Sequence, residues 1–82
     1  MRIRLKLYAS LSVHLPANAK GQEVDVEVSE QVSPIEILTA QGIPLAEVHL
    51  LLINGVFIPP SERNQPLKPN DELAVWPAVA GG

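Results

Sequence analysis

Two short segments alternate strictly between charged and apolar residues, and this pattern constrains the fold more than any other. In residues 2–8 (RIRLKLY), isoleucine and leucine alternate with arginine and lysine, and in residues 23–28 (EVDVEV), valine alternates with acids. A period of two is typical of a strand with one buried face. If the two strands pair antiparallel, cations face acids across the ladder, and each such pair contributes about 0.2–1 kcal/mol. The sequence therefore predicts this pairing, with a charged face and an apolar face.

The intervening residues 9–22 contain Pro16, Asn18 and Gly21, and we expect a loop that can include a helical turn. A helix is predicted to begin at residues 33–36 (SPIE). These residues supply a capping serine, a proline at the first helical position and the glutamate of a capping box. Gly42 is a natural left-handed stop, so the helix should be two to three turns long. We expect its inward residues to be Ile35 and Leu38.

The second half of the chain predicts three more strands. Residues 50–53 form an apolar run, and Asn54-Gly55 is typical of a type I′ turn that returns the chain through residues 56–58. A polar connection follows, with Leu67 as its expected anchor. Residues 72–76 (ELAVW) form the last strand, with Leu73 and Val75 inward and Ala74 and Trp76 outward. Strands around one helix indicate an α+β layer.

Length and composition exclude several classes of function. The 82 residues form one domain without room for a deep catalytic cavity. No cysteine is present, and the two histidines, His14 and His49, lack ligand-like spacing, so we expect no metal site. The net charge of −3 argues against nucleic acid as a partner, and the chain has no apolar run that would span a membrane. Asp71 and Glu72 should face opposite ways, which disfavours an acid–base pair. We expect a cytoplasmic protein.

Three stretches carry a resemblance to a known family. They are INGVFI (residues 53–58), LKPNDELAVWPAVAGG (residues 67–82) and the terminal Gly81-Gly82. With them, the chain resembles ubiquitin-like β-grasp proteins and, more narrowly, the sulfur carriers of molybdopterin synthesis (MoaD-like) and thiamine synthesis (ThiS-like). The family ending matches at Leu67, Asp71, Glu72, Leu73, Val75, Pro77, Gly81 and Gly82, whereas Asn70 replaces a glycine and tolerates the same left-handed turn.

The resemblance implies a fold and a division of the chain. We expect a ubiquitin-like β-grasp with a mixed sheet of four to five strands on one short helix, the first and last strands being parallel neighbours. Residues 1–76 would form the domain, and residues 77–82, here called the tail, would be a flexible, extended, reactive end. Fully extended, six residues reach at most about 20 Å. Because glycine has no Cβ, the end of the tail can enter a narrow site in a partner.

The resemblance also implies a chemistry. The carboxylate of Gly82, with Gly81 before it, would be adenylated and converted to a thiocarboxylate that donates sulfur in molybdopterin biosynthesis. The chain would bind no cofactor and would not be an enzyme on its own. A MoeB/ThiF-like adenylating enzyme would use ATP and Mg²⁺, and the acceptor partner would be a molybdopterin synthase large subunit or a thiazole synthase. The position of Pro77 favours the molybdopterin branch.

An apolar patch at the root of the tail is the predicted docking surface for these partners. We expect it to comprise Trp76, Pro77, Val79 and Phe57, because exposed tryptophan is a frequent hot-spot residue. In the alternative, Trp76 folds over the edge of the core. Three other functions stay open: a thiamine-pathway carrier, a ubiquitin-like modifier conjugated to lysine through Gly82, and an interaction module without tail chemistry.

Overall fold

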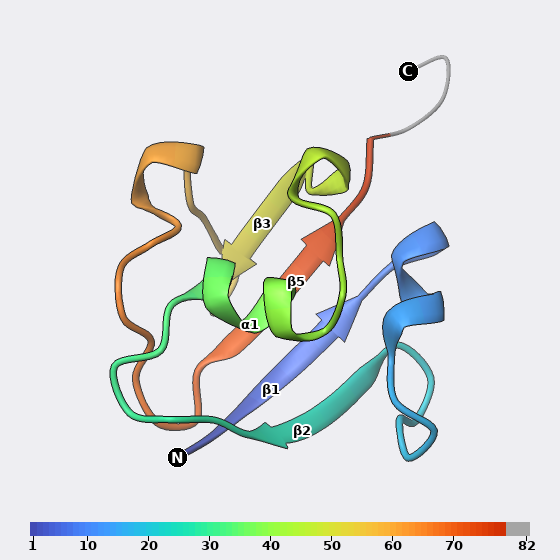
Figure 1. Cartoon of the computed structure of the whole chain (residues 1–82), viewed down its shortest axis with the longest axis horizontal. Helices are drawn as coiled ribbons and strands as arrows, with labels where there is room; N and C mark the ends of the chain where they lie inside the picture. Colours follow the sequence, from blue (N-terminus) through green and yellow to red (C-terminus); the bar gives the residue numbers. More distant parts are fainter. Residues whose placement is uncertain (79–82) are drawn as a thin grey trace.

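A five-stranded mixed sheet forms the centre of the molecule (Figure 1). In this computed structural model, the strand order is β2-β1-β5-β3-β4. Residues 1–78 are described, and residues 79–82 lie outside the described part of the chain. The strands are β1 (Arg2–Leu7), β2 (Glu23–Glu27), β3 (Leu50–Ile53), β4 (Val56–Phe57) and β5 (Glu72–Trp76). The ubiquitin-like β-grasp predicted from the sequence is confirmed.

The first two strands pair as the alternating charges predict. β1 and β2 are antiparallel, and the register places Arg2 opposite Glu27, Arg4 opposite Asp25 and Lys6 opposite Glu23. β5 lies on the other side of β1 and runs parallel to it. The first and last strands are therefore neighbours in the middle of the sheet, as the family resemblance implied.

The second hairpin joins β3 to the short edge strand β4. Asn54 and Gly55 form the turn with φ angles of 51° and 81°, as a type I′ turn requires. β4 ends at Phe57, one residue before the predicted end, and Pro59 and Pro60 follow. An edge strand of two residues limits unwanted pairing with other chains.

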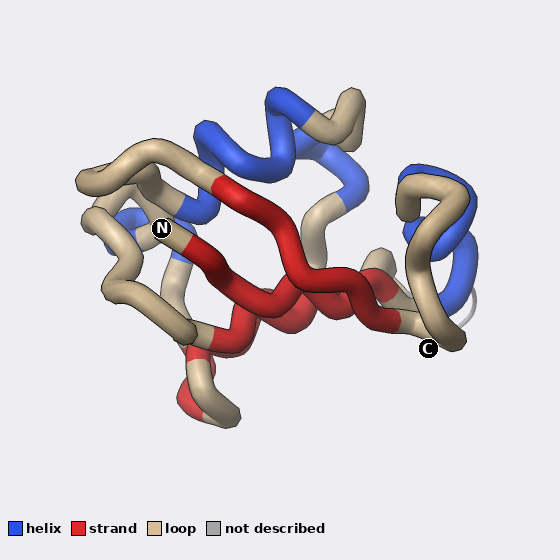
Figure 2. The backbone as a smooth tube through the Cα atoms, turned by 90° about the horizontal axis from the view of Figure 1, so that it is seen from below, coloured by secondary structure: helices blue, strands red, loops and turns tan. Residues whose placement is uncertain are grey.

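One helix, α1 (Pro34–Ala40), packs on one face of the sheet, as Figure 2 shows. Ser33 caps it, and the capping box with Glu36 is complete. Gly42, with a φ of 79°, continues the chain beyond the helix end as expected. The prediction for the inward face was wrong in part. Leu38 is buried, but Ile37 is buried beside it and Ile35 is only half-buried, because so short a helix turns its middle residues towards the sheet.

Three 3₁₀ helices complete the fold: η1 (Ala9–His14), η2 (Leu45–Glu47) and η3 (Pro60–Glu62). η1 is the helical turn expected in the first connection. Leu67 is 5% exposed and anchors the last connection, and Asn70 has the left-handed φ of 68° that replaces the family glycine. Within residues 1–78, no helix has the length and hydrophobicity needed to cross a membrane. The buried core comprises Ile3, Leu5, Leu7, Leu11, Val24, Ile37, Leu38, Ile43, Leu51, Leu67, Leu73 and Val75.

Candidate functional site: the root of the tail

The chain leaves the domain from the middle of the sheet, at the end of β5 (Figure 1). Both neighbours hold this end in place. The Tyr8 backbone N–H donates to the Val75 carbonyl oxygen at 3.1 Å, and the His49 N–H donates to the Trp76 carbonyl oxygen at 3.0 Å. Pro77 is then half-buried and Ala78 is exposed. The direction in which the tail begins is therefore fixed by backbone hydrogen bonds on both sides.

An aromatic stack lies at this exit. The rings of Tyr8 and Trp76 are parallel within 4°, and their centroids are 4.3 Å apart. Trp76 is half-buried, and it lies against a ring from the parallel strand rather than over the core edge. Tyr8 is not among the residues that the sequence predicted for this site. The β1–β5 register places Leu7 beside Val75, so the next residues of both strands meet. The family resemblance implied the parallel pairing of the first and last strands, but this contact also depends on their register, which the sequence does not indicate.

Apolar side chains continue from this stack across the face of the sheet opposite α1. β3 aligns Leu50 with Trp76 and Leu52 with Phe57, so these side chains share one face. Phe57 is 52% exposed, and Leu50 and Leu52 are half-buried. We call Tyr8, Leu50, Leu52, Phe57 and Trp76 the tail-root patch.

The structure places the predicted docking residues as follows. Trp76 and Phe57 lie in the tail-root patch and are joined through β3, and Pro77 directly follows the patch. Ala74 was expected to point outward. It lies on that face, but it is only 5% exposed because it is small and stands between Leu52 and Lys6 in neighbouring strands. Val79, Gly81 and Gly82 lie outside the described residues.

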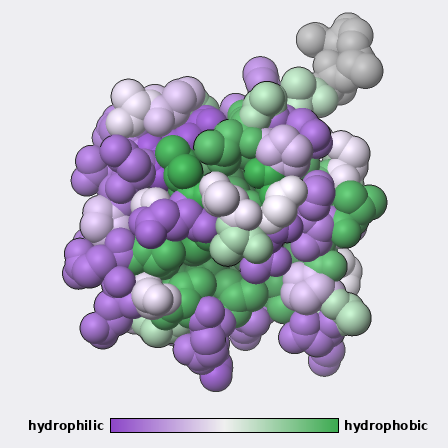
Figure 3. Space-filling view, viewed as in Figure 1, coloured by the Kyte–Doolittle hydropathy of each residue, from purple (hydrophilic) through white to green (hydrophobic). Residues whose placement is uncertain are grey.

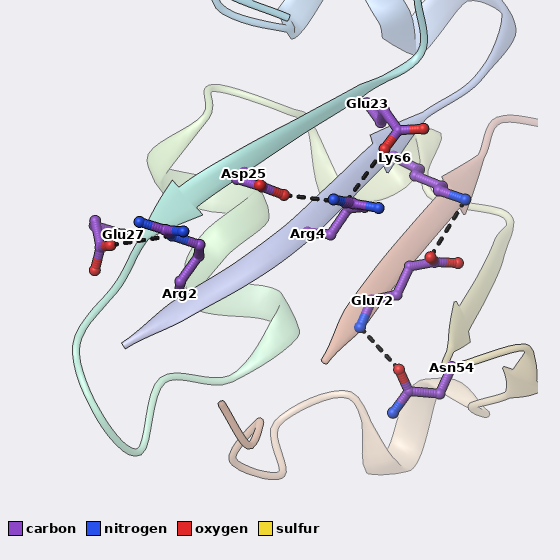
Figure 4. A network of polar contacts seen from close by, with 8 residues as sticks. All are labelled: Arg2, Arg4, Lys6, Glu23, Asp25, Glu27, Asn54 and Glu72. Atoms are coloured by element: carbon purple, nitrogen blue, oxygen red, sulfur yellow. Dashed lines mark hydrogen bonds and ion pairs between the residues drawn. The ribbon is translucent and has the colours of Figure 1, made fainter. Parts of the chain in front are cut away.

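The other half of the same face is charged, and the charges pair with one another (Figure 4). The Arg4 Nε lies 3.0 Å from Asp25 Oδ1 and 3.2 Å from Glu23 Oε2, and the Lys6 Nζ lies 3.3 Å from Glu72 Oε2. The hydrogen bond with Arg4 lowers the pKa of the Asp25 carboxyl, and the same bond raises the pKa of the Arg4 guanidinium. These exposed pairs fix the strand register, and each contributes little to stability.

Asn54 fastens the beginning of β5 to the β3–β4 turn. Its side-chain oxygen accepts from the Glu72 N–H at 2.9 Å, and its amide nitrogen donates to Asp71 Oδ1 at 2.8 Å. Asp71 also accepts from the Lys68 N–H at 2.8 Å. Asp71 therefore has a structural role at the start of β5, just as the stack holds its end.

Side chains that perform catalysis are not gathered at this site. Within residues 1–78, no three of His, Cys, Asp and Glu are grouped to hold a metal ion. His49 is exposed and His14 half-buried, each on a different connection. What the arrangement can do chemically is to present the following residues of the chain to another protein, beside an apolar surface.

Comparisons with known proteins agree with this architecture. Residues 1–81 match the family described as Mut7-C ubiquitin. SAMP1 from Haloferax volcanii is similar in structure, with a TM-score of 0.67, 22% sequence identity and full coverage of both chains. A second structure, of H. volcanii small archaeal modifier protein 1, has a TM-score of 0.66 and 24% sequence identity. The match covers 95% of this chain and 98% of that chain.

A more distant similarity is to a chain in the complex of subunits 1 and 2 of molybdopterin-converting factor from Helicobacter pylori 26695. Its TM-score is 0.58 at 18% identity, with full coverage of both chains. The comparison with curated protein sequences gave no match. At these identities the structural likeness establishes the β-grasp fold, and the family match covers nearly the whole sequence. The chain belongs to the Mut7-C ubiquitin family.

Proposed function

We propose that this protein is a sulfur carrier of molybdopterin biosynthesis, with the Gly82 carboxylate as its reacting group. The observation that carries the proposal is the exit of the chain from the central strand β5, beside the tail-root patch. This placement supports a role in which the domain docks on a partner while residues 77–82 enter its active site. The proposal requires that the polypeptide ends, or is cut, after Gly82.

The reaction needs activation because a carboxylate is a poor electrophile. An oxygen of the Gly82 carboxylate attacks the α-phosphorus of ATP, and pyrophosphate leaves with its Mg²⁺. A donor at the oxidation level of hydrosulfide then attacks the carbonyl carbon. The C–S bond forms as the C–O bond to AMP breaks, and the proton of the donor passes to solvent. The products are a thiocarboxylate and AMP.

Two partners follow from this chemistry. An adenylating enzyme supplies the nucleotide site and the Mg²⁺, because within residues 1–78 no three of His, Cys, Asp and Glu are grouped to hold a metal ion. A sulfur acceptor like the molybdopterin synthase large subunit is the second, and the similarity to a chain from a two-subunit molybdopterin-converting factor supports it. The tail-root patch is the surface that we assign to both contacts, with Trp76 and Phe57 as the expected anchors. A thiazole synthase remains the alternative acceptor.

Intact-protein mass spectrometry tests the proposal. The protein is incubated with ATP, Mg²⁺, a hydrosulfide source and an adenylating enzyme from the same cell, and the spectrum is recorded before and after. We expect the mass gain of one oxygen replaced by one sulfur, located at Gly82 by fragmentation. The matched control is the same chain with one tryptophan added after Gly82, which should stay unmodified. Modification of the extended chain, or of a side chain instead, refutes the role of Gly82.

A protein modifier is the second candidate, and the similarity to small archaeal modifier protein 1 favours it. It shares the adenylate, but a lysine amine attacks the carbonyl carbon, an amide forms, and AMP and a proton leave. Proteomics of the native host separates the two functions. Conjugates in which the end of this chain is joined to lysines of other proteins would support the modifier function, provided that they disappear when Gly82 is deleted. Thiocarboxylate without such lysines supports the carrier.

A further inference from the structure

Arg63, directly after η3, is a buried arginine that forms no ion pair with any residue from 1 to 78. Its side chain is on the helix side of the sheet, and the residue is only 6% exposed. The Nε–H donates to the Ile58 carbonyl oxygen at 2.9 Å, and Nη2 donates to the His49 carbonyl oxygen at 3.4 Å. None of the ion pairs within residues 1–78 includes it. A buried cation usually has a carboxylate beside it, because desolvation of an isolated charge is costly.

One edge of this guanidinium is still available. Nη1 makes no hydrogen bond within residues 1–78. In this part of the chain, every side-chain nitrogen that is fully buried does have a hydrogen-bond partner. Nη1 therefore reaches the accessible surface although the rest of the side chain is buried. An arginine edge with free N–H groups suits a carboxylate, which accepts two parallel hydrogen bonds.

The side chain of Arg63 lines a small apolar groove between α1, η2 and η3. The groove has a volume of about 140 Å³, and its other lining residues are Ile35, Leu38, Leu45, Val48 and Pro60. Leu45 forms the rim and is 48% exposed. Figure 3 shows hydrophobic surface on this side of the molecule, in the region between η3 and η2. Aliphatic side chains and Arg63, whose Nη1 makes no hydrogen bond within residues 1–78, thus line the same hollow.

We propose that this groove binds a glutamate side chain of a partner protein, flanked there by aliphatic residues. The carboxylate pairs with the free edge of Arg63, and the two methylenes of the glutamate pack on the aliphatic walls. The size of the groove decides between a metabolite and a protein partner. Sites for small ligands usually measure about 300–1,000 Å³, and this hollow of 140 Å³ holds a single side chain. The exposed Leu45 extends the contact beyond the hollow.

A purely structural role for Arg63 is the competing explanation. Its two bonds to carbonyl oxygens join the entry of β3 to the segment after β4, and Ile35 N–H also donates to the Arg63 carbonyl at 3.2 Å. A purely structural role of this kind uses Nε and Nη2 and does not involve Nη1 or the apolar hollow that Arg63 lines. The two roles differ in one measurable property, which is discrimination between a carboxylate and its neutral amide.

Nuclear magnetic resonance titration of the full chain measures that property. The probes are acetyl-Leu-Glu-Leu-Lys-amide, its twin with glutamine in place of glutamate, and butyrate. We expect the glutamate peptide to bind at least about tenfold more tightly than its twin, because a charge-assisted bidentate pair is lost with the amide. The shifts should centre on the amides of Ile35 and Val48 and on the Arg63 Nε–H. Butyrate should bind at least about tenfold more weakly than the glutamate peptide, because it lacks the flanking contacts.

Variants keep the test independent of folding. Arg63→Met should abolish the discrimination, but it also removes two internal hydrogen bonds. Leu45→Glu adds an acid at the exposed rim without touching the core, and it should weaken the glutamate peptide at least about fivefold by charge repulsion. Val13→Glu is the matched control, since Val13 is 79% exposed on η1 and the same charge there should change nothing.

Three results would overturn the proposal. Equal affinity for the glutamate and glutamine peptides would mean that Arg63 has only a structural role. Butyrate binding as tightly as the peptide would assign the groove to a free acid instead of a protein. Shifts centred on the tail-root patch would place the contact on the wrong face. None of these results bears on Gly82, so the groove and the proposed sulfur chemistry stand or fall separately.

Discussion

The stack of Tyr8 on Trp76 should be a measurable part of what fixes the start of the tail, and Tyr8→Leu tests it. Leucine keeps an apolar side chain beside Trp76 but removes the parallel ring at 4.3 Å. Aromatic pairs contribute about 0.5–1.5 kcal/mol beyond the area they bury. Because Tyr8 is only half-buried, little else is lost, and its backbone bond to Val75 remains. We therefore expect a loss of about 1 kcal/mol in the free energy of unfolding, or a Tm lower by about 4–8 °C.

A double-mutant cycle with Trp76→Leu isolates the ring–ring contribution. Urea unfolding of the four proteins is followed by far-UV circular dichroism, and the fluorescence of Trp76, the only tryptophan of the chain, reports the stack wherever it is present. The coupling should be about 0.5–1.5 kcal/mol. Tyr8→Phe is the matched control, because the Tyr8 hydroxyl makes no hydrogen bond within residues 1–78 and the ring is retained. A coupling below about 0.3 kcal/mol, the usual limit of additivity, would refute the reasoning.

Substitutions at two further positions, Asn54 and Asp25, test the contacts that hold the sheet together around this site. Asn54→Gly keeps a residue that adopts a φ of 51° but deletes two exposed side-chain hydrogen bonds, so urea unfolding should show a loss of about 1–2 kcal/mol. Asn54→Ala should lose about 1–2 kcal/mol more from left-handed strain, and an alanine variant as stable as the glycine variant would contradict that assignment. Asp25 has a folded-state pKa below its usual 3.8, so its stabilisation is complete above that pH and is lost as pH falls through the lower, folded value. Asp25→Asn should therefore flatten the fall of stability below about pH 4, measured by urea unfolding at a series of pH values. Identical pH dependence in the wild type and Asp25→Asn would show that the Arg4 contact does not persist in solution.

Local patterns were sufficient to predict most of the fold. The alternating charges of residues 2–8 and 23–28 specify their register, because a slip by one residue would move every charge to the apolar face. The helix start and the type I′ turn were also predictable, since capping and positive φ depend on only a few neighbouring residues. The parallel neighbours β1 and β5 came from the family resemblance, because contacts between distant segments leave no period in the sequence.

Apart from the inward face of α1, the missed features depend on pairs of segments far apart in the chain. Tyr8 meets Trp76 only through the parallel register. Ala74 is buried because its cross-strand neighbours are longer than it is, which its own position in an alternating strand does not reveal. Arg63 reads as a polar loop residue, and its burial depends on carbonyl oxygens contributed by residues 49 and 58. A sequence pattern reflects the periodicity of a single helix or strand, whereas each of these contacts joins two separate segments of the chain.

For the proposed carrier function, the central position of β5 has a mechanical consequence. A partner that draws residues 77–82 into its active site pulls along β5, which is hydrogen-bonded to β1 on one side and to β3 on the other. An edge strand would resist this pull through one ladder of hydrogen bonds, whereas β5 resists it through two. Asn54 holds the beginning of the strand and the Tyr8–Trp76 stack holds its end. In the proposed function, the binding energy of the docked domain can therefore drive insertion of residues 77–82. The strand that precedes these residues stays hydrogen-bonded in the sheet during the insertion.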